Sequence, residues 1–136
     1  MRVILDTNIL VSALLVRTGT PSKIYRSWVE GDFLLVTCKE QLGELRSTLR
    51  KPALKARIRA DQAGRMINNL NALALMVDSL PYVQRSPDPE DDFLLATAEA
   101  GHADYLVTGD KSGLLSLVKH HGTRILTAND FASRLR

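Results

Sequence analysis

The stretch Arg2-Val3-Ile4-Leu5-Asp6-Thr7-Asn8, at the start of the chain, decides the predicted fold. The apolar, partly β-branched run from Val3 to Leu5 predicts a short buried strand, and Asp6 follows where this strand gives way to a helix through Leu15. Ligands of parallel α/β sheets bind outside the carboxyl ends of the strands, so Asp6 lies where it could contact a ligand. Alternatively, Asp6 only caps the helix; if Asn8 is the cap, Asp6 needs another role.

Strand-like and helix-like segments alternate along the rest of the chain, and no Asn-Gly hairpin signal interrupts them. This pattern predicts one α/β domain over residues 1–136, with three layers: a central parallel sheet of four or five strands and helices on both faces. The first strand is expected at the centre. Further strands are predicted over 33–36, 75–77, 105–107 and 124–126, and further helices over 21–30, 40–49, 53–73, 89–100, 114–120 and 128–135.

Composition is that of an ordinary globular protein, with 45% hydrophobic and 24% charged residues among 136. Its single cysteine, Cys38, excludes an internal disulfide and is expected to be buried. No apolar run is long enough to span a bilayer, so we expect a cytoplasmic protein without a membrane partner. The net charge of +3 is compatible with nucleic acid, and seven of the basic residues lie between Arg46 and Arg65 against only Asp61.

Carboxylates recur next to the predicted strand ends. Asp110 follows the strand over 105–107, and Glu44 lies on the helix after the second strand, where a Thr37–Glu40 capping box would already explain Glu40. Four acids crowd the start of the helix that begins at Pro89: Asp88, Glu90, Asp91 and Asp92. Among them Asp91 shares a helical face with Leu94, Leu95 and Ala98 and should point inward; Asp92 is the second choice.

Converging carboxylates repel one another unless a cation lies between them. An all-oxygen set selects Mg²⁺ or Mn²⁺, whereas Zn²⁺ would want His or Cys, and the three histidines, His102, His120 and His121, are expected at the surface or at helix ends. Hard cations held by carboxylates suit phosphoryl transfer and phosphodiester hydrolysis. The residues therefore predict a hydrolase-like metal site.

These motifs also resemble the signatures of the PIN-domain nucleases, in order and over nearly the whole chain from Arg2 to Leu135. The branch that the chain looks most like contains toxins of toxin–antitoxin pairs, which carry a similar run of acids and a similar Val-Thr-Gly-Asp-Lys. The matching segments are Asp6-Thr7-Asn8, Glu44, Asp91 before Leu94-Leu95-Ala96-Thr97-Ala98, and Leu106-Val107-Thr108-Gly109-Asp110.

The resemblance implies a Mg²⁺- or Mn²⁺-dependent endoribonuclease that acts on single-stranded RNA, forms a homodimer and is inhibited by a cognate antitoxin protein. It also implies the roles of individual residues: Asp6, Glu44, Asp91 and Asp110 would bind one or two metal ions, and Thr7 or Thr108 would orient a ligand. Many relatives have another acid shortly after the position of Asp110, where this chain has Ser112 and Gly113.

Two other classes of function remain open at this stage. A catalytically inactive PIN-fold module would bind RNA or protein without turnover, and the missing acid after Asp110 favours it. A phosphatase or receiver-like domain would use an aspartyl nucleophile. That class needs a second Asp near the end of the first strand or a suitably placed Lys, and Thr7-Asn8-Ile9 provides neither.

Overall fold

A mostly parallel β-sheet forms the centre of the computed structural model, which describes residues 1–135. Its order is β3-β2-β1-β4-β6-β5, so β1 is central as predicted, and only β5 runs antiparallel to its neighbour. The described part contains six strands rather than four or five because β5 was not predicted. The strands are β1 (Arg2–Leu5), β2 (Leu34–Cys38), β3 (Leu75–Val77), β4 (Tyr105–Val107), β5 (Lys119–His120) and β6 (Thr123–Leu126).

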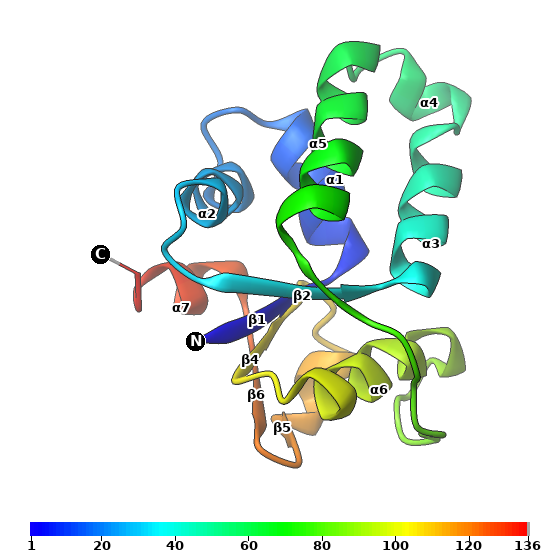
Figure 1. The fold of residues 1–136 in the computed structure, drawn as a ribbon, viewed down its shortest axis with the longest axis vertical. Coiled ribbons are helices and arrows are strands. Elements are labelled where there is room, and N and C mark those ends of the chain that lie inside the picture. Colours follow the sequence, from blue (N-terminus) through cyan, green and yellow to red (C-terminus); the bar gives the residue numbers. More distant parts are fainter. Residues whose placement is uncertain (136) are drawn as a thin grey trace.

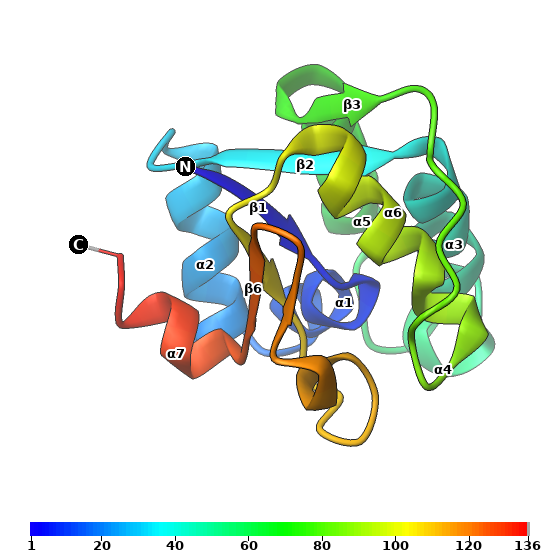
Figure 2. The same cartoon turned by 90° about the horizontal axis from the view of Figure 1, so that it is seen from below.

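Helices cover both faces of this sheet and complete the three predicted layers (Figure 1). One face is covered by α1, α2, α3 and α5, the other by α6, and α7 packs beside α2 (Figure 2). The helices are α1 (Thr7–Leu15), α2 (Thr20–Val29), α3 (Lys39–Leu49), α4 (Pro52–Lys55), α5 (Ala60–Leu73), α6 (Asp92–Gly101) and α7 (Ala128–Ala132), with 3-10 turns η1 (Pro89–Asp91) and η2 (Leu114–Leu117). Across residues 1–135, no helix combines the length and apolar character needed to cross a bilayer.

The alternation of side chains along β1 explains the two cores. Val3 and Leu5 point into the core beneath α1, α2, α3 and α5, whereas Ile4 points into the core beneath α6. All three side chains are at most 1% exposed. A strand buried on both faces must be apolar along its whole length, which is why β1 reads as an uninterrupted hydrophobic run.

The helix predicted over 53–73 is in fact two helices. Arg59 adopts an extended conformation between α4 and α5, and the turn directs Ile58 into the core, where it is 8% exposed. The prediction of a single helix over 114–120 is also wrong. Val118 has φ 66 and ends η2, after which β5 and β6 form a hairpin around His121 and Gly122.

The predicted capping box is replaced by a buried hydrogen-bond chain. Thr37 belongs to β2, and its hydroxyl donates to Oε1 of Gln41 at 2.6 Å. The Gln41 amide donates to the carbonyl oxygen of Leu5, also at 2.6 Å. Cys38, buried as predicted, is the N-cap of α3 without a side-chain cap bond. This chain of bonds fixes α3 against the end of β1, directly before Asp6.

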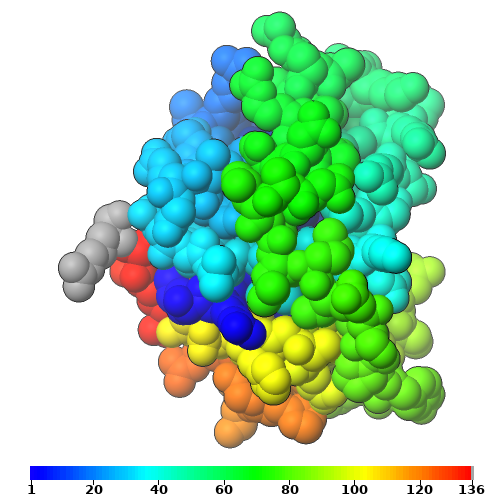
Figure 3. All heavy atoms as spheres, in the orientation of Figure 1, coloured from blue at the N-terminus to red at the C-terminus, as the bar shows by residue number. Residues whose placement is uncertain are grey.

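The molecular surface follows from this layering. In Figure 3, α5 (green) and α2 (light blue) cover one side of the molecule closely. The beginning of the chain (dark blue) reaches the surface between α2 and the yellow segment near residue 100, and Met1 is 48% exposed. The first residues of β1 and β2 are likewise more exposed than the residues that follow them.

Gly101 is required by close packing. A Cβ added to it would lie 2.5 Å from Cγ1 of Val36, so we expect Gly101→Ala to lower the free energy of unfolding by about 1–3 kcal/mol. Gly64, exposed on α5, is the matched control: an added Cβ there meets nothing within 4 Å among the described residues, and Gly64→Ala should stabilise by about 0.5–1 kcal/mol. Urea unfolding measures both effects. A Gly101→Ala protein as stable as wild type would contradict this packing.

Candidate active site

A cavity of about 410 Å³ opens at the carboxyl ends of the central strands. It contains four acids that the sequence singles out, each from a different part of the fold: Asp6 after β1, Glu44 on α3, Asp91 at the end of η1 and Asp110 after β4. The complete lining is Asp6, Thr7, Asn8, Glu44, Ser47, Thr48, Lys51, Asp88, Glu90, Asp91 and Asp110. Six of these residues are carboxylates, so the cavity is strongly acidic.

Asp6 is buried and held from two directions. Its Oδ1 accepts from the backbone N–H of Asn8 at 3.2 Å, and its Oδ2 accepts from the hydroxyl of Thr108 at 2.7 Å. Asp6, and not Asn8, is therefore the N-cap of α1. Capping does not exclude the second role, because Asp6 also lines the cavity. Burial raises the pKa of Asp6 above its usual range; the two hydrogen bonds oppose this, and the nearby Asp110 reinforces it.

Thr108 connects the acids that follow the two neighbouring strands. Its buried hydroxyl donates to Asp6 and accepts from the backbone N–H of Asp110 at 3.3 Å. Oδ1 of Asp110 also accepts from the N–H of Gly113 at 3.0 Å and from the hydroxyl of Ser112 at 3.3 Å. The two residues that occupy the place of the further acid thus orient Asp110.

Asp91 and Asp92 have different surroundings. Asp91 lines the cavity, and its partial burial together with the charges of Asp6, Asp88, Asp110 and Glu44 raises its pKa to about 6.

Asp92 does not line this cavity. Its Oδ1 accepts from the backbone N–H groups of Arg85 at 3.0 Å and Ser86 at 2.7 Å. It therefore anchors the loop that leads to the acids, and the geometry favours Asp91 as the inward group.

Helix α3 contributes a polar face that sequence reasoning missed. Ser47 and Thr48 follow Glu44 at spacings of three and four, so these three residues lie on one side of α3 and line the cavity. The helical period predicts Ser47 and Thr48 from the position of Glu44. Lys51, in extended conformation between α3 and α4, lines the cavity as well. Lys51 is the one cationic side chain among the described residues that line the cavity.

The cavity has the chemistry expected of a Mg²⁺ or Mn²⁺ site. Its acids offer only oxygen donors, which hard cations prefer. The hydroxyl of Thr7 is also buried beside Asp6, and within residues 1–135 it has no hydrogen-bond partner. A buried hydroxyl without a partner is costly, and a bound ion with its water would satisfy it. The carboxylates that would hold such a cation are Asp6, Glu44, Asp91 and Asp110, which line one cavity.

Basic side chains lie on the other side of α3. Arg46, Arg50 and Lys55 border a groove of about 450 Å³ whose floor includes Leu49 and Ile58. Because α3 carries Arg46 and Arg50 toward this groove and Glu44 toward the acidic cavity, one helix separates the positive surface from the negative one. The basic segment is exposed, as expected of residues that contact phosphates or solvent.

Comparison with known proteins identifies the fold family. Comparison with curated proteins finds no significant match. Among solved structures, VapBC2 from Rickettsia felis, bound to a DNA fragment from its promoter, aligns with a TM-score of 0.60 at 15% identity over 93% of this chain and 98% of the other. FitAcB from Neisseria gonorrhoeae aligns with a TM-score of 0.54 at 13% identity, over 93% and 97%. The sequence profile of the PIN domain matches residues 2–112, and the chain belongs to the PIN domain family.

Proposed function

We propose that this protein is a metal-dependent endoribonuclease that hydrolyses single-stranded RNA, with Asp6, Glu44, Asp91 and Asp110 as ligands of Mg²⁺ or Mn²⁺. PIN domains are generally nucleases that use a divalent metal. The observation that carries the proposal is the meeting of these four acids in one cavity, although they come from four separate parts of the chain. Such a concentration of negative charge has no evident structural purpose and is stabilised by a cation.

The surrounding residues prepare the cavity for phosphodiester hydrolysis. When bound, the cation would offset the charge that develops on the phosphate and favour attack by water. Thr108 and the Asn8 amide keep Asp6 in one orientation, so this carboxylate needs no rearrangement during the reaction. Lys51 lies in the same wall and can donate to a non-bridging phosphate oxygen, while Ser47 and Thr48 can donate to the neighbouring sugar or phosphate.

The proposed activity is tested by incubating the purified protein with a mixed pool of single-stranded RNA in Mn²⁺, in Mg²⁺ and in EDTA. We expect cleavage with either metal and none in EDTA, because the four acids repel each other and a polyanionic substrate without a cation. Duplex RNA, tested under the same conditions, shows whether cleavage is restricted to single strands. Cleavage that persists in EDTA would contradict the proposal.

RNA binding should depend on the basic groove. Replacing Arg46 and Arg50 together by glutamate removes two phosphate contacts and adds repulsion, so we expect RNA affinity to fall at least about tenfold at low salt, with a shallower dependence on salt concentration. Binding is measured in Ca²⁺ at several salt concentrations. Replacing Lys23 on α2 and Arg124 on β6 by glutamate lowers the net charge by the same amount away from the groove, and is the control. Unchanged affinity and salt dependence in the double variant would exclude this surface as the RNA path.

We also propose that the protein is the toxin of a toxin–antitoxin pair, acting in the cytoplasm as a homodimer that a cognate antitoxin inhibits. This rests on its fold likeness to VapBC2 and FitAcB. Expression of the active protein should then arrest growth, whereas the Asp6→Asn variant should not. Equal growth with both proteins would contradict a toxin role.

The alternative is a PIN-fold module that binds RNA or protein without cutting. One observation favours it: Ser112 and Gly113 occupy the place of a further acid and donate to Asp110. RNA binding without cleavage in both metals, by protein shown to bind Mn²⁺, would support this alternative.

A further inference from the structure

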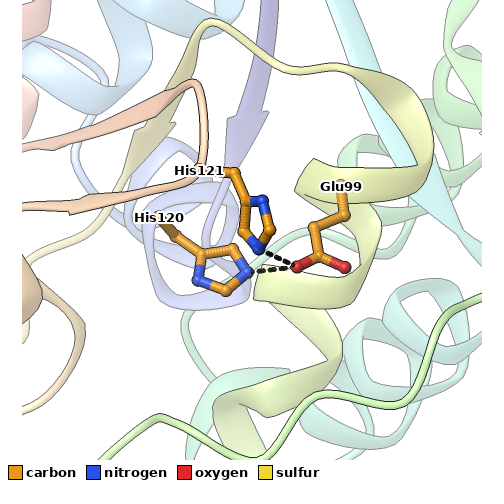
Figure 4. A group of neighbouring side chains, drawn as sticks. All are labelled: Glu99, His120 and His121. Atoms are coloured by element: carbon orange, nitrogen blue, oxygen red, sulfur yellow. Dashed lines mark hydrogen bonds and ion pairs between the residues drawn. The ribbon is translucent and has the colours of Figure 1, made fainter.

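A second group of metal-ligating side chains lies at the opposite end of α6 from the acidic cavity. Nε2 of His120 and Nε2 of His121 both lie within hydrogen-bond distance of Oε1 of Glu99, at 2.8 and 2.7 Å (Figure 4). One possible ligand atom from each of the three residues lies within 4.8 Å of the others. Glu99 is eight positions after Asp91 on the helix, about 12 Å away at 1.5 Å per residue, so the two groups are separate.

An unusual backbone conformation brings the two histidines to the same point. Neighbouring residues of an extended strand direct their side chains to opposite faces, and His120 is the last residue of β5. His121 has φ 50, in the left-handed region, although Gly122 follows it and would adopt such a conformation at less cost. Strained residues of this kind cluster at functional sites. Here the turn directs a second imidazole toward Glu99.

The cluster is accessible from solvent through one side. Glu99 and His121 line an open cavity of about 440 Å³, and His121 has a side chain that is 70% exposed. His120 lies beneath them with a side chain only 5% exposed. An ion could therefore enter past His121 and meet a fixed ligand at the base of the site.

The donor set differs from that of the acidic cavity. Two imidazole nitrogens and one carboxylate oxygen form a typical three-residue set for Zn²⁺, and water can supply the fourth ligand. Mg²⁺ avoids nitrogen donors. We propose that Glu99, His120 and His121 form a Zn²⁺ site that joins the β5–β6 hairpin to α6, independent of the proposed nuclease centre.

Binding through Nε2 of His120 requires a change in its hydrogen bonds. Nη1 of Arg85 lies 2.8 Å from Nδ1 of this ring, and since Arg can only donate, Nδ1 accepts and the hydrogen of the neutral ring is on Nε2. The ion displaces that hydrogen, which moves to Nδ1. Arg85 then leaves the ring but can keep its bond to the carbonyl oxygen of Lys119, at 2.8 Å.

The test is titration of metal-free protein with Co²⁺, a spectroscopic substitute for Zn²⁺. A four-coordinate site with nitrogen ligands gives a much stronger visible absorption band than six-coordinate oxygen sites. We expect a saturable band in wild type, displaced by an equimolar amount of Zn²⁺, and the same band in Asp6→Asn because the acidic cavity is separate. His121→Ala and Glu99→Gln should each weaken binding at least about tenfold.

His102→Asn is the matched control, since it removes the remaining histidine of the chain from the same cavity wall and Asn tolerates the left-handed conformation of His102. It should retain the band. Zn²⁺ should also raise the Tm of wild type and His102→Asn but not that of His121→Ala, which lacks one of the three proposed ligands. Two results would overturn the site: a wild-type protein without a saturable band, or bands in His121→Ala and Glu99→Gln as strong as that of wild type.

Discussion

Replacing Asp6 by asparagine should lower RNA cleavage at least about 100-fold, the largest effect of any single substitution in the cavity. Asp6 follows the central strand β1, next to Asp110 after the paired strand β4, and it is the most buried of the proposed ligands, at 6% exposed. An amide is a weak ligand for hard cations and carries no charge. The variant should therefore lose both metal affinity and cleavage.

The same variant should keep its fold. Asparagine caps helices as well as aspartate does, so the bond from the Asn8 amide can persist, and the carbonyl oxygen or amide of the new side chain can still pair with Thr108. Loss of a buried negative charge also removes repulsion from Asp110. Urea unfolding should show a free energy within about 1 kcal/mol of wild type, or higher.

Asp78→Asn is the control for this substitution. Asp78 also follows a strand, β3, but it is exposed and does not line the acidic cavity. Its replacement should leave cleavage unchanged. If Asp6→Asn cleaves RNA as fast as Asp78→Asn does, the acids described here are not the catalytic centre.

The sequence predicts the architecture well because each of the central strands is marked by an apolar run and, shortly after it, by a carboxylate. A run such as Val3 to Leu5 predicts a strand buried on both faces, and a carboxylate directly after it lies at the carboxyl end of the sheet, where ligands bind. Asp6 and Asp110 follow β1 and β4, which are paired neighbours at the point where the strand order reverses. Their proximity could thus be inferred from the order of elements alone.

Contacts between distant segments could not be inferred in this way. Thr37 and Glu40 have the spacing of a capping box, but the hydroxyl of Thr37 instead reaches Gln41, whose amide reaches Leu5 on another strand. His120 was expected at the surface or at a helix end, yet it lies in β5 and is only 4% exposed. Gln41 reaches Leu5 across 36 positions and His120 reaches Glu99 across 21, and local patterns do not contain such distant partners.

Helical periodicity succeeded where the helix itself was well predicted. The helical period applied to the sequence separates Asp91 from Asp92 by about 100° around the axis. In the structure Asp91, the last residue of η1, lines the cavity, and Asp92, the first of α6, anchors the loop at Arg85 and Ser86. Extending the same argument from Glu44 along α3 finds Ser47 and Thr48, but not Lys51, which lies beyond the end of this helix. Periodicity failed over 53–73 because the break at Arg59 depends on the burial of Ile58, which is a tertiary effect.

Mn²⁺ affinity should fall at least about tenfold between pH 7 and pH 5, because a proton competes with the ion for Asp91. The pKa of Asp91 is raised to about 6, first by burial and then by the charges of the surrounding acids, so most molecules carry this proton at pH 5. The raised pKa of Asp6 acts in the same direction. Calorimetric titration at pH 5, 6 and 7 measures the change, and Asp78→Asn should follow wild type.

Without metal, the same carboxyl should make the folded state less stable as the pH rises. The pKa of Asp91 in the folded protein, about 6, lies above its ordinary value of 3.8, so the folded state binds this proton more tightly than the unfolded state. Its favourable contribution is complete below pH 3.8 and is lost as the pH rises through 6. Asp91→Asn removes this dependence, so the stability of the variant relative to wild type should increase from pH 4 to pH 7 in EDTA. A constant difference over that range would show that Asp91 does not share the cavity with the charges that raise its pKa.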